Sequence, residues 1–588
     1  MRLVAFVGLL AGLAQAQPAV TKVEPPNWWT RTTVSPLRVL IRGKDLSGAT
    51  VSCDLKTANV KTNERGTYLF VDVSIPRNAK AGAHPLTVRT AAGTATAAFE
   101  LLVPLDPKGR FQGFDNGDVM YLAMPDRFAN GDPSNDNPEI SKGLFDPQKN
   151  RYYHGGDFKG IRDHLPYLKD LGVTALWLNP WYDNNNELNR KEIYDGQPIT
   201  DYHGYGAVDF YGVEEHFGTL RELQELVEAA HASGIKVIQD EVANHTGPYH
   251  PWVQDPPTPA WFHGSEADHI NETWQLWPLI DPYASEALTR QTLDGWFINL
   301  LPDLNQDDPE TARYLIQNTL WWIGVTGLDA IRMDTLPYVP RSFWKEWIAA
   351  ITKEYPHVNV VGEAFDADPA IPSSFQNGAL TVFDFPTYFK VRESIARGRS
   401  IRELAGMLAH DRMYPQPDNL VTFLGNHDVL RFMSEIGASI DRIKLAFTWV
   451  LTTRGIPLIY YGDEIAMEGG ADPDNRRDFP AQAFATKGRS AEQQAVFAHV
   501  RALAHLRTST PALQRGKTTN LCVSEQQWVY SREVRGQTAV VEINNADQPA
   551  TISCAGAPDN LQTVIGTGSY GQELAAHSAR VSVTRTSH

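Results

Sequence analysis

The stretch GTLRELQELVEAAHASGIKVIQDEV (218–242) combines a helix pattern with a strand pattern that follows it directly. Thr219 and Glu222 have the spacing of a capping box, which favours a helix start at this point. Apolar residues then recur at helical spacing until Gly234, a residue typical of a helix end. The run that begins at Lys236 is short and mostly apolar, as in a buried strand. The stretch therefore predicts one helix–strand unit of an α/β protein.

The same unit repeats along the middle of the chain. The strand patterns are DVMYLAMP (118–125), TALWLNP (174–180), KVIQDEV (236–242), GLDAIRMD (327–334), VNVVGEAF (358–365), ALTVFDFP (379–386), NLVTFLGNHD (419–428) and IPLIYYGDE (456–464). Helical segments such as 161–171, 341–355 and 442–454 separate most of them. Apolar strands that alternate with helices form a parallel sheet with both faces covered. Eight repeats predict a (β/α)8 barrel, a TIM barrel, over residues 115–515, with a doubly wound open sheet as the weaker alternative.

One connection in this region is far longer than the others. Over 80 residues, rich in Trp, Pro and His, separate QDEV (239–242) from GLDAIRMD (327–334). We expect an inserted subdomain at about 246–300, after the third barrel strand. It would lie above the rim where the strands end, which is where barrel enzymes carry their active sites.

Two β-rich domains are expected to flank the barrel. Residues 17–104 contain short strand patterns punctuated by glycines, which predicts an immunoglobulin-like β-sandwich. In TYLFVDVSIP (67–76), apolar residues alternate with Asp72 and Ser74, so we expect one buried face and one solvent face. Such a domain can be a sugar-binding module, a dimerisation module or a structural cap. Short strand patterns return over 517–588 and predict a C-terminal β-sandwich.

The composition excludes several classes of protein. The 588 residues include 69 Asp+Glu and 53 Lys+Arg, which gives a formal charge of −16 and makes nucleic acid an unlikely partner. A hydrophobic content of 42% with 21% charged residues indicates an ordered globular protein. Beyond the N-terminus, the chain contains no apolar run long enough to span a membrane.

The N-terminus has the pattern of a secretory signal. An apolar run from Leu3 to Leu13 precedes Ala14-Gln15-Ala16, which fits a small-x-small cleavage site. We expect a signal peptide at 1–16 and a secreted or periplasmic mature protein. Only three cysteines occur, too few for a disulfide scaffold. Cys522 and Cys554 could pair in an exported protein, and unpaired buried thiols are equally compatible with the sequence.

Polar residues follow several strand patterns at their carboxyl ends. They are Asp240, Arg332 with Asp334, Glu363, and Asn426-His427-Asp428. The carboxyl ends of barrel strands meet at one rim, so these side chains should gather there. Carboxyl groups that crowd together repel one another, which costs free energy. Such clusters are therefore typical of functional sites. The pattern therefore predicts an active site built on acids.

Asp334 and Glu363 are the strongest candidates for catalysis. Residues two apart share a strand face, so Arg332 should lie beside Asp334 and stabilise its ionised form. Alone, this pair could equally be an ordinary salt bridge. Glu363 ends an apolar strand without a basic residue, and burial near an anionic neighbour should raise its pKa. An ionised and a protonated carboxyl about 5–5.5 Å apart are what glycoside cleavage with retention requires.

These residues lie in motifs that resemble the α-amylase family, glycoside hydrolase family 13. The matching motifs are DEVANH (240–245), GLDAIRMD (327–334), GEAF (362–365), FLGNHD (423–428), LPDLN (301–305), HGYGAVDFY (203–211) and DPDNRRDF (472–479). They occur in the family's order and cover roughly residues 115–515. VEPPNWW (23–29), HGGDFKGI (154–161) and the N-terminal β domain resemble the neopullulanase and cyclomaltodextrinase branch.

The resemblance implies a role for each matching residue. Asp334 matches the nucleophile, Glu363 the general acid and base, and Asp428 the third carboxylate, which binds sugar hydroxyls. Arg332 matches the arginine that fixes the nucleophile, whereas Asp240 braces the site. The other substrate-binding positions are Tyr205, which would stack beneath the sugar, His245 and His427, which would hydrogen-bond it, and Asp472 and Arg476, which would hold the next sugar.

A loop before the second strand has the composition of a calcium site. Hard oxygen donors on a tight Gly/Pro loop suit Ca²⁺, and a solvated turn rich in Asn and Asp is the alternative. The resemblance to the branch implies that a glycine carbonyl and an aspartate of GGD complete the shell. The expected structural Ca²⁺ ligands are Asn130, Asp132, Asn135, Asp136, Gly155 and Asp157.

The sequence departs from many α-amylases at one position. Those enzymes hold another calcium with an asparagine and a histidine, which correspond to Asn244 and Tyr338 here. A phenol is a poor calcium ligand, so we expect this second site to be absent. The departure also argues against an ordinary endo-α-amylase.

The sequence thus favours a retaining α-glucan hydrolase that cleaves α-1,4 bonds in maltooligosaccharides, cyclodextrins, pullulan or starch. A glucosyl-transferring relative and an ordinary endo-α-amylase are the enzyme alternatives. An inactive starch-binding protein is the non-enzyme alternative, and the intact acids argue against it. The branch also suggests a homodimer formed through the N-terminal domain.

Overall fold

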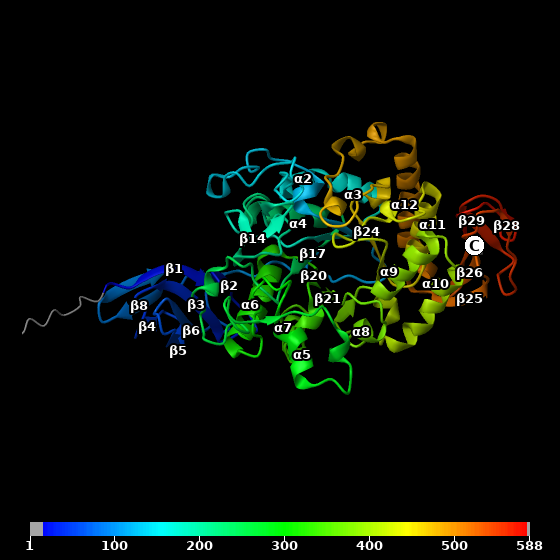
Figure 1. Ribbon diagram of the computed structural model, residues 1–588. Helices are drawn as coiled ribbons and strands as arrows, with labels where there is room; N and C mark the ends of the chain where they lie inside the picture. Colours follow the sequence, from blue (N-terminus) through cyan, green and yellow to red (C-terminus); the bar gives the residue numbers. More distant parts are fainter. Residues whose placement is uncertain (1–15, 585–588) are drawn as a thin grey trace, which may run out of the picture. The chain divides into compact units, whose positions relative to one another are not determined.

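The computed structural model describes residues 16–584 (Figure 1), so nearly all of the predicted signal peptide (1–16) lies outside the described residues. The chain divides into two compact units. Of the described residues, the first unit contains those up to Leu105 together with Gln254–Trp261 and Asp308–Trp321, and the second contains the others. In the described part, no helix is long and apolar enough to cross a bilayer.

The second unit is built on an eight-stranded parallel sheet. In sheet order its strands are β22 (Leu380–Val382), β21 (Asn359–Gly362), β20 (Ala330–Met333), β17 (Lys236–Glu241), β12 (Ala175–Leu178), β11 (Met120–Ala123), β24 (Ile456–Tyr460) and β23 (Val421–Phe423). A parallel bridge between Phe383 and Val421 joins the two end strands. The sheet therefore closes into the expected barrel, and the open-sheet alternative is wrong.

Helices follow the strands, mostly where the sequence predicted them. α4 (Leu220–Ala232) begins with the expected capping box, in which the Thr219 hydroxyl and the Glu222 backbone and side chain bond reciprocally. The single helix expected at 161–171 is instead two short helices that meet at His164. Pro166 lacks an N–H and its ring clashes with the preceding turn, which explains the break.

The chain contains further helices. They are α1 (Pro125–Phe128), α2 (Phe158–Asp163), α3 (Leu165–Leu171), α5 (Glu286–Leu293), α6 (Pro309–Thr326), α7 (Arg341–Glu354), α8 (Ala370–Ser373), α9 (Phe385–Val391), α10 (Ile401–Met407), α11 (Ile440–Thr452), α12 (Ala491–Ser509) and α13 (Pro511–Arg515). Of these, α6 begins in the first unit and ends in the second. Short ladders decorate the connections: β13 (Tyr182–Asp183) with β16 (Asp209–Val213), β14 (Asn189–Tyr194) with β15 (Gln197–Ile199), and β18 (Ile270–Asn271) with β19 (Gly295–Trp296).

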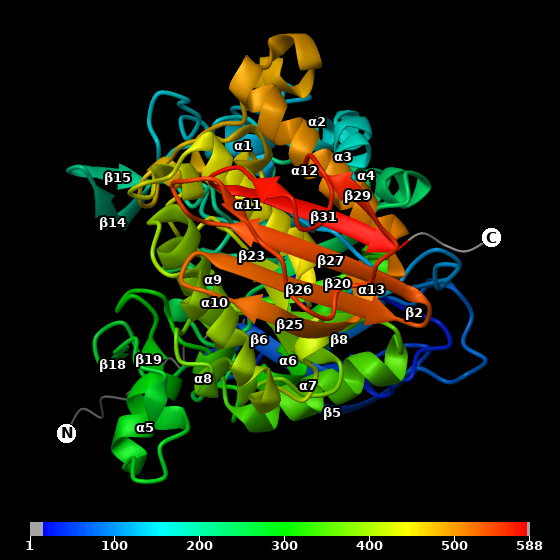
Figure 2. The same cartoon turned by 90° about the vertical axis from the view of Figure 1, so that its right-hand side faces the viewer.

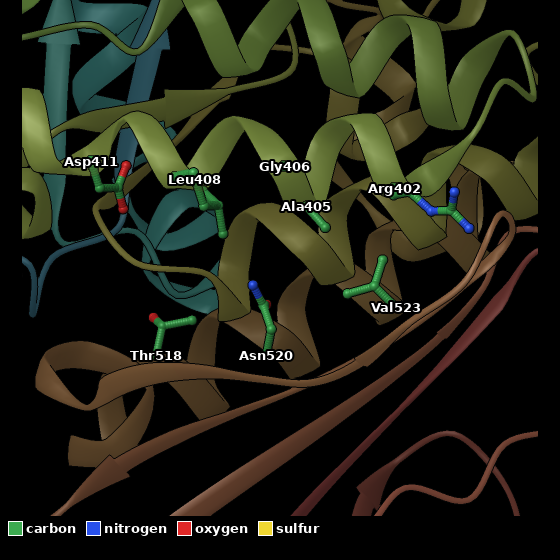
Figure 3. A pocket seen from close by; sticks show the side chains of 9 residues that line it. Arg402, Ala405, Gly406, Leu408, Asp411, Thr518, Asn520 and Val523 are labelled. Atoms are coloured by element: carbon green, nitrogen blue, oxygen red, sulfur yellow. The ribbon is translucent and has the colours of Figure 1, made fainter.

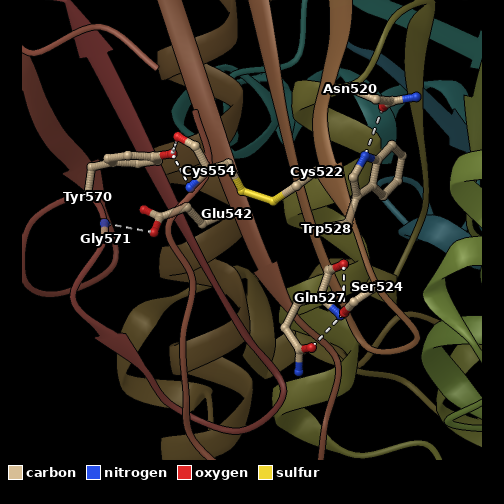
Figure 4. Close-up of a disulfide and its surroundings, with 9 residues drawn as sticks. All are labelled: Asn520, Cys522, Ser524, Gln527, Trp528, Glu542, Cys554, Tyr570 and Gly571. Carbon is tan, nitrogen blue, oxygen red and sulfur yellow. Dashed lines mark hydrogen bonds between the residues drawn. A yellow bond between two sulfur atoms is a disulfide. The ribbon is translucent and has the colours of Figure 1, made fainter. Parts of the chain in front are cut away.

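The C-terminal region is one antiparallel sheet of five strands rather than two equal layers. Its order is β25 (Lys517–Val523), β26 (Gln527–Val534), β27 (Gln537–Asn544), β31 (Ser578–Thr584) and β29 (Leu561–Ile565), and β28 (Ala550–Thr551) pairs with β30 (Glu573–Leu574). β26 contacts α10 and α13, and β31 contacts α11 (Figure 2). A disulfide joins Cys522 to Cys554 (Figure 4), which resolves the pairing that the sequence left open.

The first unit is β-rich, as expected. Its sheets are β1 (Ala19–Glu24), β3 (Leu37–Lys44), β6 (Tyr68–Ser74) and β5 (Lys56–Thr62); β4 (Thr50–Ser52), β8 (Leu86–Thr90) and β9 (Gly93–Ala97); and β2 (Asn27–Trp29), β10 (Glu100–Leu102) and β7 (Gly82–Ala83). Most of β6 is buried, so the expected solvent face at Asp72 is wrong.

The burial of Asp72 has a local cause. Arg38 pairs with Asp72 at 3.2 Å and with Glu310 at 2.6 Å. Glu310 belongs to the first half of α6, which the contacts place in this unit. The sequence assigned that helix to the barrel, so its packing against the β domain was not predicted.

We expect Asp72→Ala to lower the free energy of unfolding of this unit by about 3 kcal/mol, because the change leaves Arg38 buried with one carboxylate fewer. Chemical denaturation followed by intrinsic fluorescence measures the loss. Glu64→Ala is the matched control, because Glu64 is an exposed acid of the same domain and should change stability by less than about 0.5 kcal/mol. Equal effects of the two variants would contradict a buried ion-pair network.

Candidate active site

A cavity of about 610 Å³ lies where the barrel strands end. Eight of the ten residues predicted to act on substrate line it: Tyr205, His245, Asp334, Glu363, His427, Asp428, Asp472 and Arg476. The other two, Asp240 and Arg332, are buried completely. Another hollow, of about 420 Å³ between α10 and β25 (Figure 3), contains none of the predicted residues.

Arg332 connects the acids of this cavity. Its Nη1 lies 2.7 Å from Asp334 Oδ1 and 2.8 Å from Asp240 Oδ1, and its Nη2 lies 2.8 Å from Glu363 Oε2. The strand register explains the convergence. Asp240 is directly opposite Arg332 on β17, and Val361 of β21, two residues before Glu363, is opposite on the other side. One guanidinium therefore bonds both predicted catalytic carboxyls.

Glu363 keeps its proton at a higher pH than an ordinary glutamate does. Burial raises its pKa to about 8, and the nearby charges of Asp334 and Asp428 add to the shift, whereas Arg332 opposes it. The direction of this shift is the predicted one. The contact with Arg332 was not predicted, because the two residues lie on different strands and nothing in either motif indicates their distance.

Asp240 faces the protein rather than the cavity. Its Oδ2 accepts hydrogen bonds from Trp177 Nε1 and Tyr205 Oη, each at 2.9 Å, while its Oδ1 accepts from Arg332. Burial raises the pKa of Asp240 to about 7. These contacts fit the bracing role expected for it, since they fix the ring of Tyr205 and the guanidinium of Arg332.

The two histidines that the sequence predicted for the site, His245 and His427, are neutral. Burial lowers the pKa of His245 to about 4 and that of His427 well below its usual range. His427 Nε2 lies 2.7 Å from Tyr205 Oη, and the two rings are nearly parallel. His245 Nε2 and His427 Nδ1 are buried and have no hydrogen-bond partner among the described residues.

A chain of charges leads away from Asp428 along one wall. Arg476 pairs with Asp428 and with Asp472, each at 3.1 Å, and Arg151 pairs with Asp472 at 2.6 Å and with Glu192 at 3.5 Å. Arg151 and Glu192 were missed by the sequence analysis. Glu192 lies on the β14–β15 hairpin, where a polar turn pattern carries no signal for a cavity wall.

Aromatic side chains also line the cavity. Trp274 and Phe297 come from the insertion and lie 4.7 Å apart between ring centres, while Tyr338 and Phe365 follow barrel strands. Trp274 and Phe365 are 55% and 42% exposed. The insertion thus lies over the rim as expected, although its high Trp content did not identify which residues would line the cavity.

The predicted calcium loop brings polar side chains together, and Asn130 Nδ2 donates to Asp136 Oδ1 at 2.7 Å. A Cβ on Gly155 would lie 2.5 Å from Asp136 Oδ1 and 2.7 Å from Asn130 Nδ2, so both side chains converge over the glycine backbone. Asn135 Oδ1 is buried without a hydrogen-bond partner among the described residues. Such an oxygen fits a hard cation. The donor set therefore fits Ca²⁺.

Asp157 and Asp132 also shape this loop through the backbone. Asp157 caps α2 through Gly160 N–H, and its Oδ2 accepts from the backbone N–H of Gly131 and Asp132. Asp132 Oδ1 accepts from Ser134. These bonds fix the first residues of the loop against the start of α2.

Glu214, Glu215 and His216 form one further cluster whose atoms are spaced for a metal. Glu214 accepts hydrogen bonds from Asn184 and from His216 Nδ1, which lies 2.8 Å away. The ring of His216 stacks on Tyr153. These contacts explain why Glu214 is buried, because it is the hydrogen-bonded centre of a turn.

Two family models match the chain. One, described as the catalytic domain of α-amylase, matches residues 122–496, and the other, described as the N-terminal domain of cyclomaltodextrinase, matches residues 22–103. The crystal structure of an Anoxybacillus α-amylase superposes with a TM-score of 0.69 at 32% identity, covering 80% of this chain and 99% of that one.

Curated relatives include both transferases and hydrolases. A cyclomaltodextrin glucanotransferase of Niallia circulans is 33% identical over 78% of this chain and 63% of that protein. A cyclomaltodextrinase of Geobacillus thermopakistaniensis is 30% identical over 74% of this chain and 70% of that protein. The chain spans only 34% to 63% of the length of several curated relatives that it matches.

Proposed function

The chain belongs to the α-amylase family of glycoside hydrolases, and from this premise we propose that it is a retaining enzyme that hydrolyses α-1,4-glucosidic bonds. The observation that carries the proposal is the shared guanidinium: Arg332 bonds Asp334 and Glu363 together at the floor of one cavity. Retention requires an acid and a nucleophilic carboxylate held close together, about 5–5.5 Å apart, whereas inversion needs a wider gap for water. Two carboxyls that bond one guanidinium fit the closer arrangement.

In the first step, an oxygen of Asp334 attacks the anomeric carbon, and the bond from that carbon to the leaving oxygen breaks. Glu363, whose pKa of about 8 keeps it protonated at neutral pH, gives its proton to the leaving oxygen. Arg332 holds Asp334 Oδ1, and the hydroxyl of Thr335 bonds Oδ2 at 3.1 Å. The carboxylate is therefore fixed before the substrate arrives.

In the second step, the ionised Glu363 takes a proton from water, and the water oxygen attacks the anomeric carbon. The bond to Asp334 breaks and the carboxylate returns to its first state. Positive charge develops on the sugar in both steps. Because His245 and His427 are neutral, they can bond the sugar without opposing that charge.

We place the activity in the neopullulanase and cyclomaltodextrinase branch, with maltooligosaccharides, cyclodextrins or pullulan as substrates. The matching N-terminal domain and the related cyclomaltodextrinase support this. A glucosyl-transferring enzyme is the second candidate, because the aromatic wall of Trp274, Phe297 and Phe365 offers apolar surface to an acceptor sugar. The N-terminal sequence and the Cys522–Cys554 disulfide support export to an oxidising compartment.

We expect the protein to cleave pullulan, a cyclodextrin or soluble starch with release of sugars in the α configuration, and Asp334→Asn to lower kcat by about 10⁴-fold or more. Proton NMR of fresh products gives the configuration, and chromatography gives their length. Panose from pullulan would indicate neopullulanase activity, and longer oligosaccharides at high substrate concentration would indicate transfer. Release of β sugars, or full activity of Asp334→Asn, would contradict the mechanism.

We expect kcat/KM on starch to fall above about pH 8, because Glu363 then loses the proton that the leaving oxygen needs. Glu363→Gln should lower kcat on starch by about 10²–10⁴-fold. On α-maltosyl fluoride, whose leaving group needs no proton, the same variant should lose less than about tenfold. Equal losses on the two substrates would show that Glu363 is not the acid.

We also propose a structural Ca²⁺ held by oxygens of Asn130, Asp132, Asn135 and Asp136, with the Gly155 carbonyl and Asp157. Catalysis by carboxyls needs no metal, so the ion would act on the loop alone. When bound, it supplies positive charge that offsets the crowded acids and fixes the loop against α2. The buried oxygen of Asn135 and the convergence over Gly155 support the site.

We expect chelation with EDTA to lower the melting temperature, and millimolar Ca²⁺ to restore it, because an ion at 100 times its Kd stabilises by about 2.7 kcal/mol. Asp136→Ala should remove the response, whereas Asp146→Ala, an acid of the same region outside the site, should keep it. Differential scanning calorimetry measures the shifts. A wild-type protein indifferent to chelation would contradict the calcium site.

A further inference from the structure

Exposed apolar side chains are concentrated in one short segment. Of the fourteen large apolar residues that are exposed in the described part of the chain, six lie between residues 270 and 298. They are Ile270, Trp274, Trp277, Ile280, Tyr283 and Ile298. Soluble proteins do not usually gather such residues on the surface without a binding partner.

Part of this segment already belongs to the active-site cavity. Trp274 and Ile298 line it, and Trp274 contacts Phe297. The chain continues from Trp274 through Trp277, which begins a short 3-10 turn, and on to Ile280 and Tyr283 before α5 begins. We call Trp277 and Tyr283, together with the apolar Ile280 between them in the sequence, the aromatic strip. Figure 2 shows α5, β18 and β19, which carry and flank this segment, together at one side of the view.

The rings of the strip are available to a ligand. Tyr283 is 91% exposed and Trp277 is 45% exposed. Trp277 Nε1 donates to Gln275 Oε1 at 3.0 Å, which holds the indole while much of its surface faces solvent. A ring that is held before binding loses little conformational freedom when a ligand stacks on it.

The chemistry of the strip favours a neutral, ring-shaped ligand. Aromatic faces stack on flat apolar surfaces such as those of sugar rings. Residues 270–298 contain four acids, Glu272, Asp281, Glu286 and Asp294, against one cation, Arg290, which disfavours nucleic acid and anionic lipid. Trp274 lines the cavity and is 55% exposed, and Trp277 follows it three residues later in the chain.

We propose that the aromatic strip binds the part of a polymeric α-glucan that extends out of the cavity past Trp274. The inference rests on the proposed function, because the cavity must hold a glucan for the strip to continue it. The strip would raise affinity for polymers without touching the reacting bond, so short oligosaccharides would not reach it.

The test is the paired substitution Trp277→Ala with Tyr283→Ala. We expect the KM for soluble starch to rise about five- to tenfold with kcat unchanged, and kcat/KM for maltotriose to stay within about twofold. Trp277→Phe with Tyr283→Phe, which keeps the aromatic faces, should restore most of the starch affinity. Ile436→Ala is the matched control, because Ile436 is 82% exposed outside this segment.

A second readout separates the strip from the catalytic assignment. In the Asp334→Asn background, native electrophoresis through gels that contain soluble starch measures binding without turnover, and loss of the strip should weaken the retardation by the same factor. If the protein with an intact Asp334 cleaves no glucan, and removal of the strip still abolishes retardation, the strip proposal holds and the proposed function is wrong. Equal losses on starch and maltotriose, or no loss on either, would overturn the strip. So would a change only in oligomeric mass by light scattering, which would assign the strip to contacts between copies.

Discussion

The active site depends on one buried positive charge. Arg332 is completely enclosed and bonds Asp240, Asp334 and Glu363 at 2.7–2.8 Å. A single cation cannot neutralise three ionised carboxyls, so protons must be retained among them. Burial raises the pKa of Asp240 to about 7 and the pKa of Glu363 to about 8, so these two carboxyls hold protons near neutral pH. Of these two, only Glu363 reaches the cavity, and the division of acid and nucleophile follows from that difference.

The barrel sets this arrangement through strand register alone. Asp240, Arg332 and Val361 are opposite one another on three adjacent strands, and Asp334 and Glu363 each follow by two residues. Period-two alternation turns all of these polar side chains toward the same face of the sheet, and the strands end at the same rim. From the sequence, the same alternation placed Arg332 beside Asp334, and the ends of the strand patterns placed Asp240, Glu363, His427 and Asp428 at the same rim. Tyr205, His245, Asp472 and Arg476 were implied by the resemblance to the α-amylase family alone.

Predictions failed where distant segments decide the environment. Asp72 alternates with apolar residues as a surface residue would, yet it is buried, because α6 from a different part of the sequence supplies Glu310 to the same arginine. Arg151 and Glu192 reach the cavity through loops whose sequences show only turn propensity. The split between α2 and α3 was readable from Pro166, and the sequence analysis missed it. Long-range packing leaves no such local mark.

The most direct test of the central claim, that Asp334 forms a covalent bond to the sugar, is to trap the intermediate. A maltosyl fluoride with a second fluorine at C5 of the reacting sugar slows the second step, and mass spectrometry of the digested protein locates the added glycosyl mass. The account predicts one adduct, on the peptide that contains Asp334. An adduct on Asp428 or Asp240, or turnover of natural substrate without any covalent adduct, would contradict it.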